Sequence, residues 1–305
     1  MRIPSVAAVL PAGPPLTEQQ QIGRSAARDS CHERLLEGAV LILMEPRRVG
    51  KTGFARAVLA RIAGSGGRTA ELQLTSYPDP QLAAAELARQ IAGGLDRVVE
   101  PSRRLLDRLR TLRAPEDAGG EAPVLADLAS ALLGEARGLP AVLAHAIDHL
   151  PQGGHGAVLL DEAHVIAQWP PALQEALCLV LRANSRLGVV IASSETRALE
   201  GLVGPGGPLQ YAGYRFVLPP IAPDDWRAGL RERFALLDLA VGGDLLDRII
   251  EEAGAHPYRT MRLAQETARV ARSIASTATP APVGDGDLEA ALLAVRADPA
   301  WLELG

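Results

Sequence analysis

The sequence has few cysteines and no long apolar segment. Cys31 and Cys178 are the two cysteines among 305 residues, and they lie far apart. This number and spacing exclude a disulfide framework and a zinc site made of paired cysteines. No stretch approaches the ~20 apolar residues that cross a bilayer, and the apolar run Val6–Leu10 is too short for a signal peptide. We therefore expect a protein of the reducing cytoplasm that does not enter a membrane.

Lysine is scarcer still. Lys51 is the one lysine among 31 basic residues, and all the others are arginines. A coding bias accounts for that composition, so only the position of Lys51 carries information. The formal charge of -5 and the pI near 5.7 argue against a protein coated in positive charge for nucleic acid. A local basic stripe remains open at Ser102–Arg113, where arginines line one face of an amphipathic helical pattern.

Strand-like and helical patterns alternate along the first two thirds of the chain. Continuous apolar runs are typical of parallel strands that are buried on both faces. The predicted strands are Ala39–Met44, Thr69–Leu74, Ala157–Leu160, Gly188–Ala192 and Tyr214–Leu218. The predicted helices among them are Ser25–Glu37, Thr52–Ile62, Gln81–Leu95 and Pro171–Arg182. This alternation predicts an α/β fold with a doubly wound, mainly parallel sheet.

The two ends of the chain differ from this α/β core. Residues 1–21 are rich in proline and lack periodicity, which predicts a flexible N-terminal arm. After Pro219 and Pro220 we find only helical patterns. These are Pro223–Leu237, Gly243–Ala253, Tyr258–Ser276 and Asp285–Ala297. The expected domains are therefore the arm, a core at 22–218 and a small all-helical domain at 219–305.

A phosphate-binding pattern follows the first predicted strand. The chain reads Glu45-Pro-Arg-Arg-Val-Gly-Lys-Thr52 and continues into a helix, which is nearly G-x-x-x-x-G-K-[ST] in its strand–loop–helix context. Backbone N–H groups at a helix N-terminus, an ammonium group and a hydroxyl for Mg²⁺ suit a nucleoside polyphosphate. The residues predicted to bind it are Arg48, Val49, Gly50, Lys51, Thr52 and Gly53, and Thr52 is also a predicted metal ligand.

Glu45 departs from this pattern, because it stands where the first glycine belongs. A carboxylate beside a polyphosphate weakens affinity unless it points away or pairs with Arg47 or Arg48. The structural alternative for the whole segment is a chance Gly-Lys-Thr at a turn.

Two carboxylates follow the strand at Ala157–Leu160. At this position Asp161 is suited to hold Mg²⁺ through water, opposite Thr52, and Glu162 to orient or activate the attacking water. The alternative is an acidic N-cap of the next helix, which the helix dipole alone would favour.

Taken together, these motifs resemble a known family. Ile22-Gly23-Arg24, EPRRVGKT, VLLDEAH, Ser193-Ser194 after a strand and Gly254-Ala-His-Pro-Tyr258 are similar to the AAA+/STAND side of the P-loop NTPases. The resemblance is strongest to archaeal-type ATPases related to origin-recognition initiators. It implies a P-loop NTPase core followed by a helical lid.

The resemblance also implies roles for residues outside the two main motifs. It places the adenine at Ile22, Gly23 and Arg24, and a first sensor of the γ-phosphate at Ser193 or Ser194. His256, Pro257 and Arg259 are the expected lid contacts, with Arg259 as the second sensor. Arg215 is the expected arginine finger toward a neighbouring subunit.

The resulting functional hypothesis is an ATPase. We expect hydrolysis of ATP to ADP and phosphate with Mg²⁺, in which Lys51 and Glu162 act on the phosphates and the water, and lid movement follows the nucleotide state. The alternative is a switch or scaffold that binds ATP without hydrolysis. A protein partner or self-association is expected, and DNA is a further candidate that the net charge does not favour.

Overall fold

The computed structural model describes residues 4–13, 16–91, 139–148, 154–273 and 280–303. The chain forms two compact units. The helical unit comprises Met1–Ala26, Arg48–Phe54 and Pro219–Gly305, and the sheet unit comprises Ala27–Arg47 and Ala55–Leu218. The basic stripe predicted at Ser102–Arg113 lies outside the described residues.

The sheet unit is built on a five-stranded parallel sheet in the order β2-β3-β4-β1-β5. The strands are β1 (Val40–Met44), β2 (Arg68–Gln73), β3 (Gly156–Asp161), β4 (Leu187–Ser193) and β5 (Tyr214–Arg215). Every residue of β1, β3 and β4 is buried, which explains why these strands read as continuous apolar runs. The predicted doubly wound parallel sheet is confirmed.

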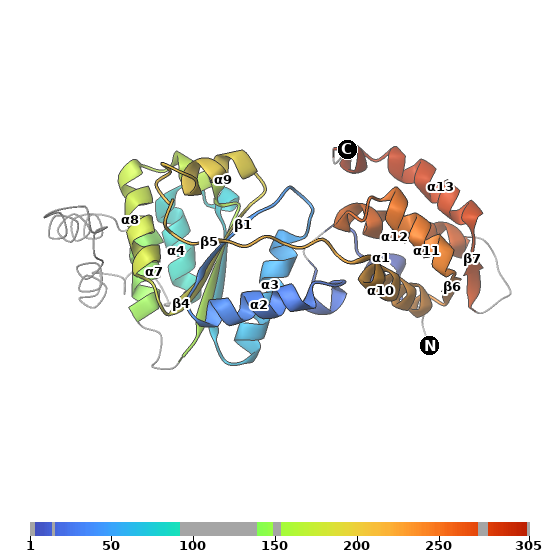
Figure 1. The fold of residues 1–305 in the computed structure, drawn as a ribbon, viewed down its shortest axis with the longest axis horizontal. Helices are drawn as coiled ribbons and strands as arrows, with labels where there is room; N and C mark the ends of the chain where they lie inside the picture. Colours follow the sequence, from blue (N-terminus) through green and yellow to red (C-terminus); the bar gives the residue numbers. More distant parts are fainter. Residues whose placement is uncertain (1–3, 14–15, 92–138, 149–153, 274–279, 304–305) are drawn as a thin grey trace, which may run out of the picture. The chain divides into compact units, whose positions relative to one another are not determined.

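Helices cover both faces of this sheet (Figure 1). They are α2 (Ser25–Leu36), α3 (Lys51–Gly64), α4 (Pro80–Ile91), α7 (Leu139–Asp148), α8 (Pro171–Ala183) and α9 (Thr196–Val203), with short 3-10 turns η2 (Leu74–Ser76) and η4 (Ala163–Gln168). Figure 1 shows α4, α7 and α8 on one side of the sheet and α2 and α3 on the other. Val40, Ile42 and Met44 of β1 pack into the cluster on the first side, as the period of two in a strand requires.

The last strand is shorter than predicted. The pattern Tyr214–Leu218 predicts five strand residues, but β5 contains only Tyr214 and Arg215. Both are exposed at the edge of the sheet, and the N–H of Phe216 makes one further bond to the carbonyl of Ile42 at 2.9 Å. Pro219 and Pro220 cannot continue such a ladder because proline has no N–H.

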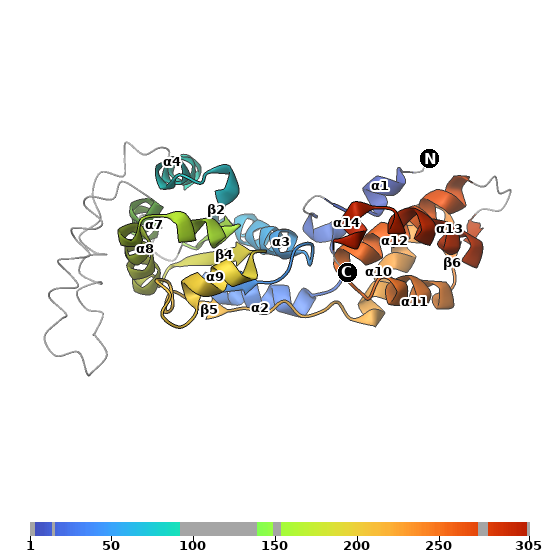
Figure 2. The same ribbon diagram turned by 90° about the horizontal axis from the view of Figure 1, so that it is seen from above.

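The helical unit packs five helices of the C-terminal region around a second core (Figure 2). They are α10 (Pro223–Leu236), α11 (Gly243–Glu252), α12 (Pro257–Ser273), α13 (Asp285–Arg296) and α14 (Pro299–Leu302). Trp226 and Phe234 of α10 are among its largest fully buried side chains. The four predicted helices are confirmed, but the region is not entirely helical. Strands β6 (Leu239–Val241) and β7 (Ala281–Val283) form a small parallel pair, too short to show a period in the sequence.

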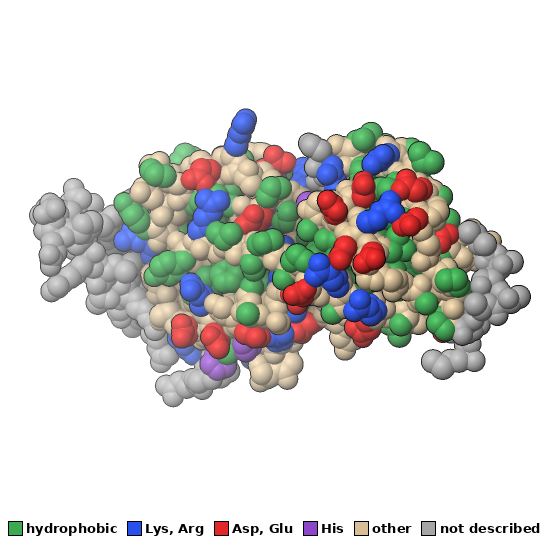
Figure 3. Space-filling view, turned by 45° about the vertical axis from the view of Figure 1, so that its right-hand side comes forward, with side chains coloured by type: hydrophobic (Ala, Val, Ile, Leu, Met, Phe, Trp, Pro, Cys, Tyr) green, Lys and Arg blue, Asp and Glu red, His purple; other side chains and the backbone are tan. Residues whose placement is uncertain are grey.

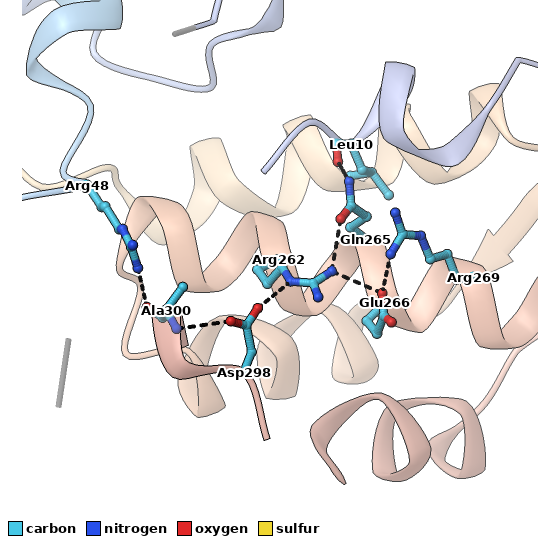
Figure 4. Close-up of polar contacts among 8 residues, drawn as sticks. All are labelled: Leu10, Arg48, Arg262, Gln265, Glu266, Arg269, Asp298 and Ala300. Carbon is cyan, nitrogen blue, oxygen red and sulfur yellow. Dashed lines mark hydrogen bonds and ion pairs between the residues drawn. The ribbon is translucent and has the colours of Figure 1, made fainter. Parts of the chain in front are cut away.

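The N-terminal segment also differs from the predicted flexible arm. It contains α1 (Val6–Val9) and a 3-10 turn η1 (Glu18–Gln20). Leu10 is fully buried in the core of the helical unit, and its carbonyl accepts a hydrogen bond from Nε2 of Gln265 at 2.8 Å (Figure 4). The prolines of this segment interrupt any helical periodicity, so the sequence gives no sign of the contact. Burial of the Leu10 side chain and hydrogen bonding of its carbonyl hold the segment in place.

Gly38, between α2 and β1, provides a test of this packing. Its φ is +79°, and a Cβ there would lie 2.5 Å from the backbone nitrogen of Arg186. We expect Gly38→Ala to lower the free energy of unfolding by about 2 kcal/mol or more in urea titrations, because strain and overlap add. Gly64→Ala is the matched control, since its Cβ would meet nothing within 4 Å, and alanine there should be neutral or stabilising by up to about 1 kcal/mol. Equal stabilities of the two variants would contradict this account.

Candidate functional site

The predicted site residues divide between the two units. The helical unit contains all those predicted to bind nucleotide, and the sheet unit contains the carboxylates, the sensor serine and the predicted arginine finger. The first set is Ile22, Gly23, Arg24, Arg48, Val49, Gly50, Lys51, Thr52, Gly53, His256, Pro257 and Arg259. The second is Asp161, Glu162, Ser193 and Arg215. Each set is held by contacts within its own unit, while the chain itself runs from β1 through the loop 45–50 into α3.

The loop after β1 makes a tight turn before α3. Arg48 and Gly50 have positive φ values of 65° and 94°, and Lys51 is the first residue of the helix. Lys51 is 6% exposed. The first-turn amides of a helix have no intrahelical acceptor, and they point along the axis to where an anion binds. The predicted strand–loop–helix context of the phosphate pattern is therefore confirmed.

Glu45 has a structural partner in the sheet unit. Its Oε1 accepts a hydrogen bond from the backbone N–H of Leu218 at 3.3 Å, which fastens the start of the loop to the chain that follows β5. Arg47 pairs with Glu195 at 2.8 Å in the same unit. A glycine at position 45 could not make the bond to Leu218, so the departure from the phosphate pattern has a packing reason.

The Ile22-Gly23-Arg24 segment contacts the phosphate loop through Arg24. Nη1 of Arg24 donates to the carbonyl of Val49 at 2.7 Å, and its Nε donates to the carbonyl of Pro219 at 2.7 Å. Gly23 has a φ of +67°, and a Cβ there would lie 2.8 Å from Oδ2 of Asp225. Only glycine allows the chain to pass so close to α10 at this angle. Ile22 is buried beside it.

His256 and Arg259, at the start of α12, add buried nitrogen atoms to the same unit. Nδ1 of His256 and Nε of Arg259 are buried without a hydrogen-bond partner in the structure. Burial lowers the pKa of His256, and the positive charges of Arg259, Arg24 and Arg48 lower it further. Several cations therefore face one region, with donor groups that remain unsatisfied. Such a site is incomplete without an acceptor, and a polyphosphate supplies oxygen acceptors with negative charge.

In the sheet unit, the strand register aligns the catalytic candidates. Met44 of β1 is in register with Ser193 of β4, and Leu160 of β3 with Ile191. Asp161 ends β3 and is 3% exposed. The loop after β1 therefore starts at the same edge of the sheet as Asp161 and Ser193. This edge, at the carboxyl ends of parallel strands, is where ligands bind in open α/β sheets.

Glu162 is held by a network of polar side chains. Oγ of Ser194 lies 3.0 Å from both carboxylate oxygens, and Nδ1 of His164 lies 3.4 Å from Oε2. The same His164 nitrogen is 3.0 Å from Oγ of Ser193, which accepts the N–H of Glu195. His164 was not among the residues predicted from the sequence. Its only signal was its place three residues after the aspartate.

The side chain of Glu162 does not cap the helix that follows it. Glu162 is the residue before η4, but its side chain makes no capping hydrogen bond, and its φ is +51°. A left-handed conformation costs a non-glycine residue about 1 kcal/mol or more, and such strain concentrates at functional sites. The carboxylate is therefore held for contacts other than those of a helix cap.

Two further predictions concern metal binding and subunit contact. Among the described residues, no group of three or more His, Cys, Asp or Glu side chains could hold a metal ion. A Mg²⁺ ion that binds nucleotide needs only one or two protein ligands beside phosphate oxygens, so Thr52 and Asp161 stay predicted ligands. Arg215 is exposed on β5, and its role as an arginine finger also stays a prediction.

The helices in the described part of the chain are too short or too polar to cross a membrane.

The lowered pKa of the partly buried His256 leads to a pH prediction. Because its pKa is lower in the folded protein than the ordinary 6.5, the unfolded chain binds more protons between these two values. The contribution of neutral His256 to the free energy of unfolding is therefore fully present above pH 6.5. It is lost as the pH falls toward the pKa of His256 in the folded protein. We expect His256→Gln to show a smaller loss of unfolding free energy between pH 7.5 and about 5.5 in urea titrations. The same loss in both proteins would contradict the assignment.

The fold was compared with those of known proteins. No family model and no curated protein matches the chain. Among solved structures, the Walker-type ATPase paby2304 of Pyrococcus abyssi has a TM-score of 0.62 and 18% identity, covering 97% of this chain and 78% of its own. The ORC1 protein of Aeropyrum pernix, solved in complex with DNA, has a TM-score of 0.55 and 16% identity, covering 95% and 69%. The RuvB Holliday junction branch migration motor of Thermotoga maritima has a TM-score of 0.52 and 12% identity, covering 95% and 74%.

These three matches each extend over 95% or more of this chain. The TM-scores, and not identities this low, show a common fold. The resemblance stated from the motifs is thereby confirmed at the level of the fold, which this chain shares with the Walker-type ATPase of P. abyssi and with the archaeal ORC1, ORC2 and CDC6P proteins.

Proposed function

We propose that this protein binds ATP with Mg²⁺ in the cytoplasm and hydrolyses it to ADP and phosphate. The observation that carries the proposal is the gathering, within one unit, of the phosphate loop, Arg24 and the buried nitrogen atoms of His256 and Arg259 that have no hydrogen-bond partner. Cations that are partly withdrawn from water are stabilised by an anionic partner. ATP meets this requirement, and it is the substrate of the chemistry that the loop motif serves.

The roles of the residues follow from their chemistry. The amides at the start of α3 and the ammonium of Lys51 bind the β- and γ-phosphates. Thr52 and Asp161 hold Mg²⁺, which when bound neutralises charge that develops on the phosphate oxygens. Glu162 accepts a proton from the attacking water and orients it in line with the bond to be broken. Ser193 contacts the γ-phosphate or the water.

Glu162 reaches this role through its neighbours. The hydroxyl of Ser194 and the ring of His164 contact its carboxylate, and His164 also contacts Ser193. A carboxylate with these partners has a defined orientation, as a general base requires. Loss of the γ-phosphate changes the contacts of Ser193, and this network carries the change to Glu162.

A second function, an ATP-dependent switch without turnover, is favoured by one specific observation. Both oxygens of the Glu162 carboxylate are already engaged by Ser194, so fewer lone pairs are left for a water molecule. In this case the lid and the exposed Arg215 would report nucleotide state to a protein partner or a second copy of the chain.

DNA is a weaker candidate partner. The ORC1 protein of A. pernix was solved in complex with DNA, but the net charge of this chain is -5. Acidic and basic side chains are also interspersed on the face of the helical unit seen in Figure 3. Binding to a phosphate backbone requires a basic surface of one sign.

The first test uses Lys51, whose ε-amine is the only lysine amine in the chain. An amine-reactive ATP analogue should label Lys51, and ATP with Mg²⁺ should protect it. Lys51→Ala should weaken ATP binding about 10- to 100-fold in equilibrium titrations, since a charge-assisted contact to phosphate is lost. Labelling that ATP does not reduce, together with an unchanged Kd in Lys51→Ala, would contradict binding at this loop.

The second test separates hydrolysis from binding. Glu162→Gln should lower steady-state phosphate release by about 100-fold or more, because the side chain no longer accepts a proton, while ATP binding is retained. Equal rates for wild type, Lys51→Ala and Glu162→Gln would rule out the ATPase. Tight ATP binding by the wild type without phosphate release would favour the switch.

A further inference from the structure

The short helix α14 contacts two of the arginines predicted to face nucleotide. Arg48 of the phosphate loop donates to the carbonyl of Ala300 and forms an ion pair with Glu303 at 3.4 Å (Figure 4 shows the contact with Ala300). Its guanidinium also lies 4.8 Å from the ring centre of Tyr258 in α12. All these partners belong to the helical unit.

Arg259 is engaged by the same helix. Its Nη2 donates to the carbonyl of Trp301 at 3.0 Å, and its guanidinium lies 5.3 Å from the Trp301 ring centre. Trp301 is 7% exposed, so this contact is part of the packed core. The four-residue helix α14 and the residue after it, Glu303, therefore supply acceptors to both cations. These acceptors are two neutral carbonyls and one exposed carboxylate, which are weaker partners for a guanidinium than a phosphate group.

Asp298 fixes α14 on the helix α12. Its Oδ1 accepts the N–H of Ala300 at 3.0 Å and so caps α14, and its Oδ2 accepts Nε of Arg262 at 3.1 Å. Arg262 in turn contacts Glu266 at 3.2 Å in the same network (Figure 4). A continuous set of contacts thus runs from α12 through Asp298 and Ala300 to the phosphate loop.

The backbone conformation of Arg48 indicates that contacts of its side chain hold the phosphate loop in place. Its φ of 65° is unfavourable for a residue with a Cβ, by about 1 kcal/mol or more. Such a conformation persists only where surrounding contacts determine it. The contacts with Ala300, Glu303 and Tyr258 are contacts of this kind.

We propose that residues 298–303 form an autoinhibitory latch on the nucleotide site. The latch occupies Arg48 and Arg259 with its own acceptors, and ATP must displace these acceptors before the arginines can contact phosphate. This inference rests on the proposed function, because it assumes that ATP binds at the loop containing Lys51. It adds a competition within the chain that lowers the apparent affinity by the fraction of molecules that are latched.

The test weakens the latch without touching the predicted nucleotide contacts. The double variant Asp298→Ala/Glu303→Gln removes the cap, the bond from Arg262 and the charge beside Arg48. We expect its Kd for ATP to fall roughly 3- to 10-fold below that of the wild-type chain. The matched control is Asp285→Ala/Glu289→Gln. It removes two acidic side chains of α13 that pair with Arg248 of α11, and it should leave the Kd unchanged.

A second measurement keeps the proposal testable should the double variant be unstable. Hydrogen exchange of the Ala300–Glu303 amides in wild type should become faster when ATP is added, because α14 leaves its position. The same amides should not respond to ATP in Lys51→Ala. The side chain of Glu303 is 68% exposed, so its replacement does not disturb packing. The single variant Glu303→Gln should bind ATP more tightly than wild type, by a smaller factor than the double variant.

The outcomes separate the two proposals. If wild type binds ATP through Lys51 but the double variant binds equally or more weakly, and exchange at 300–303 is unchanged, the latch is wrong and ATP binding stands. If only the double variant binds ATP, the latch is supported in its strongest form. If neither protein binds ATP, both the latch and the proposed function are overturned.

Discussion

The pairing of β1 between β4 and β5 is the constraint on which the arrangement of the sheet unit depends. It brings the end of β1 into register with Ser193, and the neighbouring pairing of β4 with β3 brings in Asp161. Because the strands are parallel, their carboxyl ends share one edge, and the loop to α3 starts there. The end of β1 is more than 100 positions from Asp161 and Ser193 in the sequence, and the parallel pairing of the strands aligns them.

The helical unit brings several positively charged side chains close together. Arg24, Arg48 and Arg259 all lower the pKa of His256, so the four groups share one electrostatic environment. The protein offers them carbonyls and aromatic rings: Val49 and Pro219 for Arg24, Tyr258 for Arg48, and Trp301 for Arg259. These partners balance the desolvation of the guanidinium groups without binding them as strongly as a phosphate does.

Much of the fold could be predicted from the sequence because its signals are local. The loop EPRRVGKT, the run ending in Asp161 and Glu162 and the continuous apolar strands each carry their signal within about ten residues. The features that were missed depend on distant contacts. Leu10 is anchored by Gln265, His164 is positioned by Ser193, and Asp298 links α14 to α12. No periodicity or composition encodes such pairs, and the three-residue strands β6 and β7 are too short to show a pattern.

The position of the sole lysine has a practical consequence for spectroscopy. Lys51 is the first residue of α3, directly after the left-handed turn at Gly50, and its side chain is almost entirely buried. A sample grown with ¹⁵N-lysine would therefore contain a single labelled backbone amide, and that amide lies in the phosphate loop. Its one NMR resonance would report the state of the loop without any assignment of the other residues.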